Sequence, residues 1–454
     1  MNRIIAIAAF LIASSPLLAQ AAWTQLYPTM SPPALSSGVM ACHEATGALV
    51  LLGGSGTAGA LTQAWRLQGS DWSQLPGPVP PSRSSARMVY DSLRERLVLF
   101  GGSGSGGLLQ DTWEWDGQTW TSPLLLMQPS ARSGHAMAFD RKRGVTVLYG
   151  GYQSPNNFYG DLWEWDGTVW QLMAPTNAPG PRLSSTMAFD PANENVLLHG
   201  GSVPVGTLSS IPTNDTWSWD GSSWQQHQPL TPPTLRFGPL MVCDTARGRV
   251  VLQGGSDSEA YAWEWDGQQW QMMLQSSPSM RNSHMLAYDA PNRRVVLFGG
   301  RWLGANFLLD DTWQYQTPLP ADVVPYGTGC AGTAGTPELG NVSHSLPWLG
   351  DTVHHLASGI PAGEPGAVFV SSFTQLSPMS LAAIGMPGCD LLLSLDVAEF
   401  ELAVAGVAEW TLAIPNTLAL AGVPFYQQAF VLDGPANTLG LTASNGIEVT
   451  PGIR

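Results

Sequence analysis

The feature that most restricts how this chain can fold is a pair of glycines that recurs six times at nearly constant intervals. Each pair follows a short apolar run, and successive pairs are 48, 49, 50, 54 and 45 residues apart. The six pairs are Gly53-Gly54, Gly101-Gly102, Gly150-Gly151, Gly200-Gly201, Gly254-Gly255 and Gly299-Gly300. Repeats of this length are typical of one supersecondary unit used several times, because a single unit cannot bury its apolar surface alone.

Each repeat reads as four short β-strands, which we call a to d, and the copy from Arg132 to Trp170 is the clearest. Strand b ends at the Gly-Gly pair and is apolar on both faces, as in Val295–Phe298, which is typical of a sheet covered on both sides. Strand c carries tryptophans at positions i and i+2, as at Trp163 and Trp165, so both lie on one face. We expect that face to pack against the next repeat. An Asp-Gly turn then leads to strand d and another tryptophan.

Paired glycines after the second strand, followed by tryptophans in the third and fourth, resemble the Kelch repeat, the unit of the central domain of galactose oxidase. The resemblance covers roughly residues 23 to 316 and implies an all-β fold, with a six-bladed β-propeller over residues 22–318. The last repeat lacks a fourth strand of its own, whereas Trp23–Leu26 matches the fourth strand of the first repeat, Trp72–Leu75. We therefore predict that the N-terminal strand closes the ring, which removes an open sheet edge.

Charge and composition argue against two kinds of partner. The 454-residue chain has 19 Lys and Arg against 34 Asp and Glu, a formal net charge of −15, and Lys142 is its sole lysine. Nucleic-acid phosphates and anionic membrane surfaces are bound by basic surfaces, so we expect neither partner. The 19 tryptophans are too many to be scattered and indicate a repeated structural position.

The N-terminus has the pattern of a secretory signal. Arg3 precedes an apolar run from Ile4 to Leu18, and Ala19-Gln20-Ala21 forms a small-residue cleavage pattern, which predicts a signal peptide at residues 1–21. No later apolar run approaches the ~20 residues that span a bilayer, so we predict no membrane span. We expect an exported protein in the periplasm, at the cell surface or outside the cell.

The four cysteines divide into two groups. Cys330 and Cys389 fall in one C-terminal segment, and because an oxidising compartment permits disulfides, we predict a bond between them. Cys42 and Cys243 occupy equivalent positions in the first and fifth repeats, which are not neighbours in a six-bladed ring. We expect these two to be buried free thiols.

From about Tyr326 the tryptophan repeat stops, and residues 326–454 are predicted to form a small β-sandwich. Apolar runs bounded by Pro and Gly, at residues 367–370, 391–395 and 428–432, read as its strands. The phrases at residues 326–332 and 444–446 look similar to C-terminal modules of exported bacterial proteins, especially those of planctomycete-type organisms. An adhesive or surface-retention role is one hypothesis for this module.

The most systematic candidate site is a set of five arginines, each eight residues before the aspartate that ends strand a. They are Arg83, Arg132, Arg182, Arg236 and Arg281. They fall between strand d of one repeat and strand a of the next, on the same face as the b-to-c loops, where the Kelch resemblance implies a ligand-binding surface. Arginines there can hold carboxylates by bidentate pairing. The alternative is that they hydrogen-bond neighbouring loops and only support the fold.

Other candidates for ligand binding lie on the same face. Tyr152, Tyr159 and Trp302 belong to the b-to-c loops, where aromatic side chains could stack on sugars or grip a peptide, or could instead cover the rim. His135 and His284 fall at equivalent repeat positions near the arginines. We add them to the ligand-binding set.

We identify no catalytic residue, metal site or cofactor. Galactose oxidase needs two Tyr, two His and a Tyr-Cys crosslink around copper, and this set cannot be placed here, because the positions equivalent to His135 and His284 hold Ala86, Ser185 and Pro239. The leading hypothesis is an exported, non-enzymatic propeller that binds a peptide, protein or glycan through its loops. The alternatives are a secreted galactose-oxidase-like oxidase or glycan-processing enzyme, and a structural component of the envelope.

Overall fold

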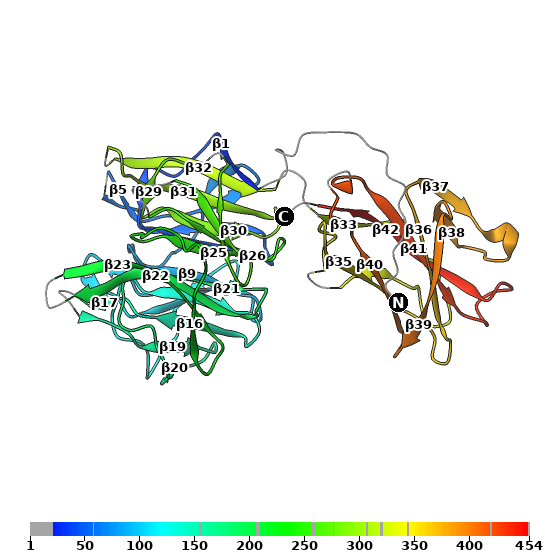
Figure 1. Ribbon diagram of the computed structural model, residues 1–454, viewed down its shortest axis with the longest axis horizontal. Helices are drawn as coiled ribbons and strands as arrows, with labels where there is room; N and C mark the ends of the chain where they lie inside the picture. Colours follow the sequence, from blue (N-terminus) through cyan, green and yellow to red (C-terminus); the bar gives the residue numbers. More distant parts are fainter. Residues whose placement is uncertain are drawn as a thin grey trace. The chain divides into compact units, whose positions relative to one another are not determined.

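The computed structural model describes residues 21–57, 59–153, 157–205, 209–255, 260–275, 277–305, 307–317, 321–342, 345–417 and 420–452. They form two compact units: one is Ala21–Gln316, and the other begins at Thr317. In Figure 1 the first unit runs from blue to yellow-green, and the second continues to red. Apart from Ala21, the predicted signal peptide lies outside the described residues.

The first unit is built from antiparallel sheets that repeat one strand order. Sheet 1 contains β3 (Val39–His43), β4 (Ala48–Leu52), β7 (Ala64–Gln68) and β8 (Asp71–Leu75); sheet 2 contains β9 (Arg87–Asp91), β10 (Arg96–Phe100), β13 (Thr112–Trp115) and β14 (Trp120–Thr121); sheet 3 contains β15 (Ala136–Asp140), β16 (Val145–Tyr149), β19 (Leu162–Trp165) and β20 (Trp170–Met173). Sheet 4 contains β21 (Thr186–Asp190), β22 (Asn195–Val205), β23 (Ser209–Trp219) and β24 (Trp224–His227); sheet 5 contains β25 (Leu240–Asp244), β26 (Arg249–Gln253), β27 (Ala262–Trp265) and β28 (Trp270–Met273); sheet 6 contains β30 (Met285–Asp289), β31 (Arg294–Trp302), β32 (Leu308–Gln316), β1 (Ala22–Leu26) and the short β29 (Arg281–Asn282). Short ribbons in the loops are formed by β2 (Leu35–Ser36), β5 (Ser55–Gly56) and β6 (Gly59–Ala60), by β11 (Ser103–Gly104) and β12 (Gly107–Leu108), and by β17 (Tyr152–Gln153) and β18 (Asn157–Phe158).

The first strand of each sheet lies innermost. These six strands contact one another in the closed order β3, β9, β15, β21, β25, β30 and back to β3. The second strand of each sheet is buried on both faces, as the apolar runs before the glycines indicated. This all-β arrangement is consistent with a β-propeller.

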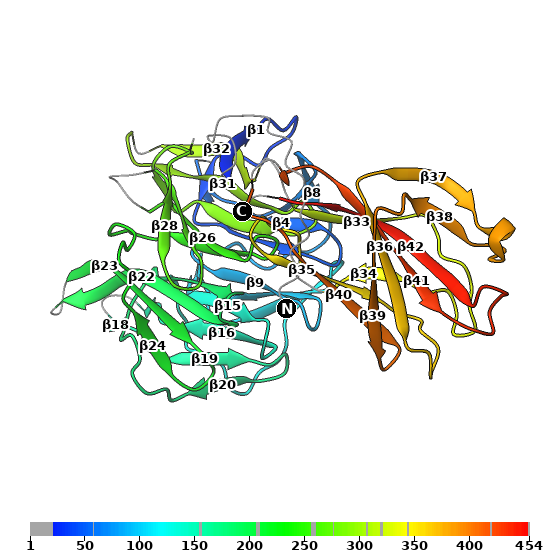
Figure 2. The same cartoon turned by 45° about the vertical axis from the view of Figure 1, so that its right-hand side comes forward.

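The N-terminal strand lies where the sequence placed it. β1 pairs antiparallel with β32, and Trp23 stands opposite Tyr315. Figure 2 shows the two strands side by side at the top of the first unit. Trp23 is buried there, so the strand adds side-chain packing as well as backbone hydrogen bonds to sheet 6.

Tryptophans join neighbouring sheets by hydrogen bonds as well as by packing. The indole Nε1 of Trp165 donates to Glu114 of sheet 2 at 2.9 Å, and that of Trp219 donates to Glu164 of sheet 3 at 2.8 Å. Trp170 of strand d likewise donates to the hydroxyl of Thr112 at 2.9 Å. The neighbour is therefore the preceding sheet and not the next one as expected, because this face of each sheet is turned toward the sheet formed one repeat earlier.

The second unit has an eight-stranded antiparallel sheet with the order β33-β42-β41-β36-β39-β40-β35-β34, and a separate hairpin of β37 and β38. The strands are β33 (Asp322–Tyr326), β34 (Leu339–Asn341), β35 (Thr352–Ala357), β36 (Gly366–Ser372), β37 (Gln375–Ser380), β38 (Asp390–Leu393), β39 (Val397–Val404), β40 (Val407–Ala413), β41 (Phe425–Leu432) and β42 (Leu441–Thr450), with one 3-10 turn, η1 (Ala382–Ile384). The three runs predicted as strands lie in β36, β38 and β41.

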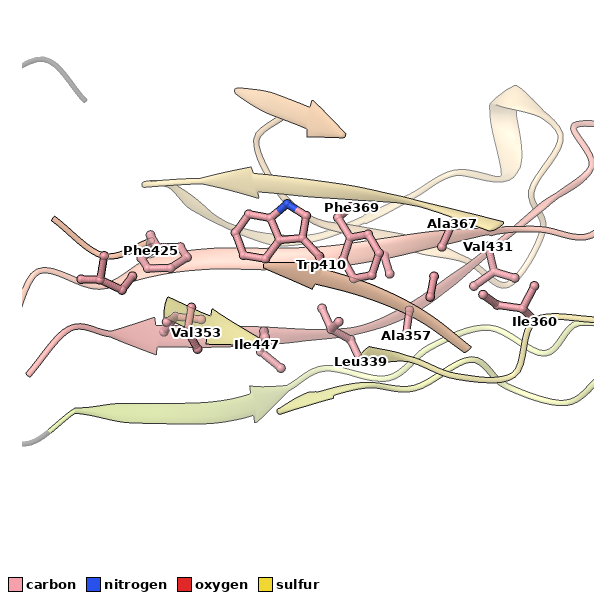
Figure 3. Packing of buried hydrophobic residues seen from close by; sticks show 14 residues of the cluster. Leu339, Val353, Ala357, Ile360, Ala367, Phe369, Trp410, Phe425, Val431 and Ile447 are labelled. Carbon is pink, nitrogen blue, oxygen red and sulfur yellow. The ribbon is translucent and has the colours of Figure 1, made fainter. Parts of the chain in front are cut away.

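Two buried clusters stabilise this unit. In the first, the rings of Phe369 and Trp410 stack with centroids 6.4 Å apart, among Val353, Val431 and other apolar side chains (Figure 3). The second surrounds Cys330 and Cys389, whose predicted disulfide is confirmed. The disulfide ties the residue that precedes β38 to the segment that follows β33.

Replacing Cys330 and Cys389 with serine should lower the free energy of unfolding of the second unit by about 4 kcal/mol, because the bond restricts the unfolded chain between cysteines 59 residues apart. The first unit should keep its transition, since Cys42 and Cys243 are free. Denaturant unfolding followed by tryptophan fluorescence and by near-ultraviolet circular dichroism checks this. An unchanged second unit, or a shifted first unit, contradicts the prediction.

Candidate functional site

One end of sheets 1 to 6 gathers the b-to-c loops and the segments that enter each inner strand. These two kinds of segment are joined by backbone pairing, as between Ser84 and Ser103 and between Ser133 and Tyr152. We call the surface they form the loop face. All six inner strands start there and run toward the opposite face.

The candidate arginines on this face are buried and paired within the chain. The two terminal nitrogens of Arg132 donate to the two carboxylate oxygens of Asp161 at 2.7 and 2.8 Å, and Nη1 also donates to the carbonyl of Gly150 at 3.0 Å. The same bidentate pairing recurs in Arg83–Asp111, Arg182–Asp215 and Arg281–Asp311. Arg236 is also buried and donates to the carbonyl of Gly254 at 2.9 Å.

The carbonyls of Arg83, Arg132, Arg182 and Arg281 also accept a hydrogen bond from a glycine of the preceding sheet. The backbone N–H of Gly102 in sheet 2 donates to the carbonyl of Arg132 at 2.9 Å. Gly101 has a φ of 62°, and a Cβ there would lie 2.8 Å from the same carbonyl oxygen. The first glycine of the pair is thus needed both for a left-handed backbone and for close approach by the neighbouring segment.

The aspartates are held in their charged form. Burial alone would raise the pKa of Asp161, but its hydrogen bond and ion pair with Arg132 and a hydrogen bond from Trp163 lower that pKa below the ordinary value. The indole of Trp163 donates to Asp161 at 2.7 Å. The first tryptophan of strand c therefore belongs to the same network as the arginine.

This geometry favours the structural interpretation of the arginines. Both ends of each bidentate pair come from the chain itself, and the guanidinium groups of Arg83 and Arg132 lack solvent exposure. Direct contact of these arginines with a ligand stays a prediction.

His135 and His284 lie in the interfaces between sheets. The ring of His135 packs edge-on against Phe100 of sheet 2, with centroids 5.6 Å apart, and the ring of His284 lies against Gly254 of sheet 5. Burial, with the charges of nearby arginines, lowers the pKa of both imidazoles, that of His284 to about 3, so both are neutral at pH 7. His199 is also fully buried.

The three aromatic candidates are partly exposed but packed within their own loops. The guanidinium carbon of Arg132 lies 4.0 Å from the ring centre of Tyr159, which covers this arginine. Trp302 packs edge-on against Phe307 at 5.0 Å. Tyr152 pairs through its backbone with Ser133. These three side chains thus reach the surface of the loop face, whereas the two histidines are buried between sheets.

Sequence reasoning missed a cavity on the axis of the six sheets. Its volume is about 170 Å³, and all six inner strands line it. The second residue of each strand forms one layer around it: Met40, Met88, Met137, Met187, Met241 and Leu286. We call this the methionine layer. Its signal in the sequence is a methionine thirteen residues before the Gly-Gly pair in five of six repeats.

Charged side chains mark the two ends of the cavity. At the loop face, Arg87 occupies the first position of β9, where the other inner strands hold Val39, Ala136, Thr186, Leu240 and Met285. At the other end, Arg141 of sheet 3 forms an ion pair with Glu44 of sheet 1. Cys42 and Cys243 also line the cavity, and burial raises the pKa of both thiols to about 12, so they are neutral.

Apolar side chains are exposed on the loop face of sheets 4, 5 and 6. Six of them, between 37 and 55% exposed, form what we call the apolar rim: Val205, Ile211, Leu235, Phe237, Tyr261 and Phe307. They come from the β22–β23 hairpin, from the loops of sheet 5 and from the β31–β32 hairpin.

Within the described ranges, no three or more His, Cys, Asp or Glu side chains are grouped so that they could hold a metal ion. No helix in the same part of the chain has the length and apolar character needed to cross a membrane.

Comparison with known proteins supports the fold alone. No protein-family model matches the chain, and no curated protein matches it. Among solved structures, one titled "Structure of YjhT", a β-propeller protein, is similar with 15% sequence identity and a TM-score of 0.50, over 63% of this chain and 95% of that one. The likeness supports a propeller-like arrangement of the first unit.

Replacing Arg132 with alanine should lower the free energy of unfolding of the first unit by about 3 kcal/mol, because it leaves the carboxylate of Asp161 without its partner. The matched control is Lys142→Ala, which breaks an ion pair with Glu194 between two side chains that are 58 and 61% exposed and should leave the transition unchanged. Urea unfolding of both variants measures this. Equal effects of the two substitutions would count against a structural role for Arg132.

The free energy of unfolding of the first unit should also depend on pH. Four aspartates have pKa values below the ordinary carboxyl value of 3.8: Asp111, Asp161, Asp215 and Asp311. Their contribution to the free energy of unfolding is therefore complete above pH 3.8, and it is lost as the pH falls through the lowered pKa values. The difference in urea midpoint between the wild type and Asp161→Asn should therefore shrink as the pH drops from 5 to 2. A difference that stays constant with pH would refute this.

Proposed function

We propose that the protein is an exported, non-enzymatic binding protein that recognises a peptide, protein or glycan on its loop face. In this proposal residues 1–21 are a signal peptide, 22–318 form a six-bladed Kelch-type propeller closed by the N-terminal strand, and 326–454 form a β-sandwich module like those that end exported bacterial proteins. The disulfide between Cys330 and Cys389 is compatible with export, since such bonds persist in oxidising compartments.

The observation that carries the proposal is the apolar rim. Exposed apolar side chains that occur singly are ordinary on a protein surface, but clustered ones mark interaction sites. Here Ile211, Phe237 and Phe307 are each at least half exposed and stand on loops of three neighbouring sheets. Aromatic anchors of this kind supply much of the binding energy at interfaces and stack well on sugar rings.

The rim stands on a rigid support. In sheets 4 and 6 the loop segments are held by the buried pairs Arg182–Asp215 and Arg281–Asp311, and in sheet 5 Arg236 donates to the carbonyl of Gly254. A surface that is ordered before binding loses less conformational entropy when the ligand arrives. In this proposal the paired arginines support recognition by ordering the loops that carry the rim.

Binding of the mature chain to peptide and glycan arrays tests the proposal. The variant Ile211→Ser/Phe237→Ser/Phe307→Ser should weaken any ligand found by at least about tenfold, because anchor residues each contribute more than ~1 kcal/mol. The matched control is Leu93→Ser/Val169→Ser, which removes apolar side chains that are 73 and 56% exposed in turns at the opposite end of the sheets.

The control variant should bind like the wild type. A ligand lost equally in both variants, or retained by the rim variant, would place recognition elsewhere. If the wild type binds nothing on either array, the proposal is wrong.

A further inference from the structure

The guanidinium of Arg87 lies in the central cavity without a counter-charge. Its Nη1 donates to the carbonyl of Ala86 at 3.0 Å, and within the described part of the chain no carboxylate pairs with it. Protein surrounds the group, and burial lowers the pKa of Arg87 to about 10, still well above neutrality. Part of the side chain nevertheless remains accessible. A desolvated charge without a partner costs stability, so its presence calls for an explanation.

The charge of Arg87 affects the pKa of histidines on two sides of the ring. It lowers the pKa of both His135 in sheet 3 and His284 in sheet 6. Sheets 3 and 6 stand on opposite sides of the closed ring of inner strands. Arg87 lines the cavity from sheet 2, and as the first residue of β9 it lies at the loop-face end.

The next layer of the cavity is apolar. The methionine layer lies one residue further along each inner strand than Arg87, and it is followed by small side chains such as Ala41, Ala138 and Ala188. Methionine side chains are flexible and polarisable, so they adapt to apolar groups of different shapes. These side chains also pack between neighbouring sheets, and together they give this level of the cavity an apolar component.

The far end of the cavity offers no comparable attraction to an anion. There Arg141 is already paired with Glu44, so the two charges cancel. A ligand that carries one negative charge and one apolar group is thus oriented by the cavity, with its charge toward the loop face.

We propose that the central cavity binds a carboxylate attached to an apolar group about the size of a benzene ring, with the carboxylate on Arg87 and the apolar group against the methionine layer. The volume of about 170 Å³ suits this size, since an apolar cavity of ~150 Å³ holds benzene. Arginine binds carboxylates through two parallel hydrogen bonds. The inference goes beyond the proposed function, because it depends on the cavity and not on the rim.

A free acid and the C-terminal residue of a peptide both present this chemistry. The test is calorimetric titration of the mature chain with acetate, butanoate, hexanoate and 3-phenylpropanoate, and with a short peptide that ends in phenylalanine. Affinity should rise about fourfold for each methylene from acetate to hexanoate. The corresponding amides, which have the same apolar part but no charge, should bind at least tenfold more weakly. A peptide that binds more tightly than the free acids, and loses this when its C-terminus is amidated, identifies a peptide as the source of the carboxylate.

Two variants separate this site from general effects on the fold. Arg87→Met should abolish the difference between acid and amide without lowering the melting temperature of the ligand-free protein, because it removes an uncompensated charge. Arg66→Met is the matched control, since Arg66 lies outside the cavity on β7 with the hydroxyl of Ser73 as its hydrogen-bond partner. This control should bind acids like the wild type.

Three results would overturn the inference. The acids could bind no better than the amides, acetate could bind as tightly as hexanoate, or Arg87→Met could still bind the acids. The rim variant should still bind acids. If it loses the array ligand but still binds acids, that result bears only on the proposed function. Absence of acid binding with an intact array ligand refutes only the inference about the cavity.

Discussion

The buried ion pair between an arginine and an aspartate is the interaction on which the loop face depends. Arg132 reaches Asp161 in the b-to-c loop of its own sheet, while its carbonyl accepts a hydrogen bond from Gly102 of the preceding sheet. One residue thus fixes two loops and the junction between two sheets. Because a buried charge is costly without its partner, the pair also makes alternative loop conformations unfavourable.

A second set of contacts also links each of several sheets to the preceding sheet, in the body of the sheets and not in their loops. The indoles of Trp165 and Trp219 donate to glutamates one sheet earlier, so sheets 3 and 4 are bonded to their predecessors through strand c as well as through their loops. In sheet 6 a tyrosine takes this position, and the hydroxyl of Tyr315 donates to Glu264 of sheet 5 at 2.7 Å. The repeat therefore preserves a polar link between sheets while it varies the aromatic group that provides it.

Much of this could be predicted because it is periodic. The glycine pairs, the tryptophans and the position of β1 follow from the spacing of the repeat. The partner of each arginine could not be predicted so readily, because the aspartate lies 28, 29, 33 or 30 residues away, on the far side of a loop of variable length. Arg87 could not be recognised for the opposite reason: it is the one charged residue at a strand position that is uncharged in the other five sheets, and only the closed ring of inner strands places this residue at the cavity.

The pairing of β1 with β32 ties together residues about 290 positions apart in the chain. During synthesis the amino-terminal end emerges first, yet its hydrogen-bonding partner emerges only after every other sheet has appeared. Until then both edges are open, and each can pair with another molecule of the same protein. The pairing that completes sheet 6 can therefore form only after the rest of the first unit has been synthesised, and contacts so distant in sequence are slow to form.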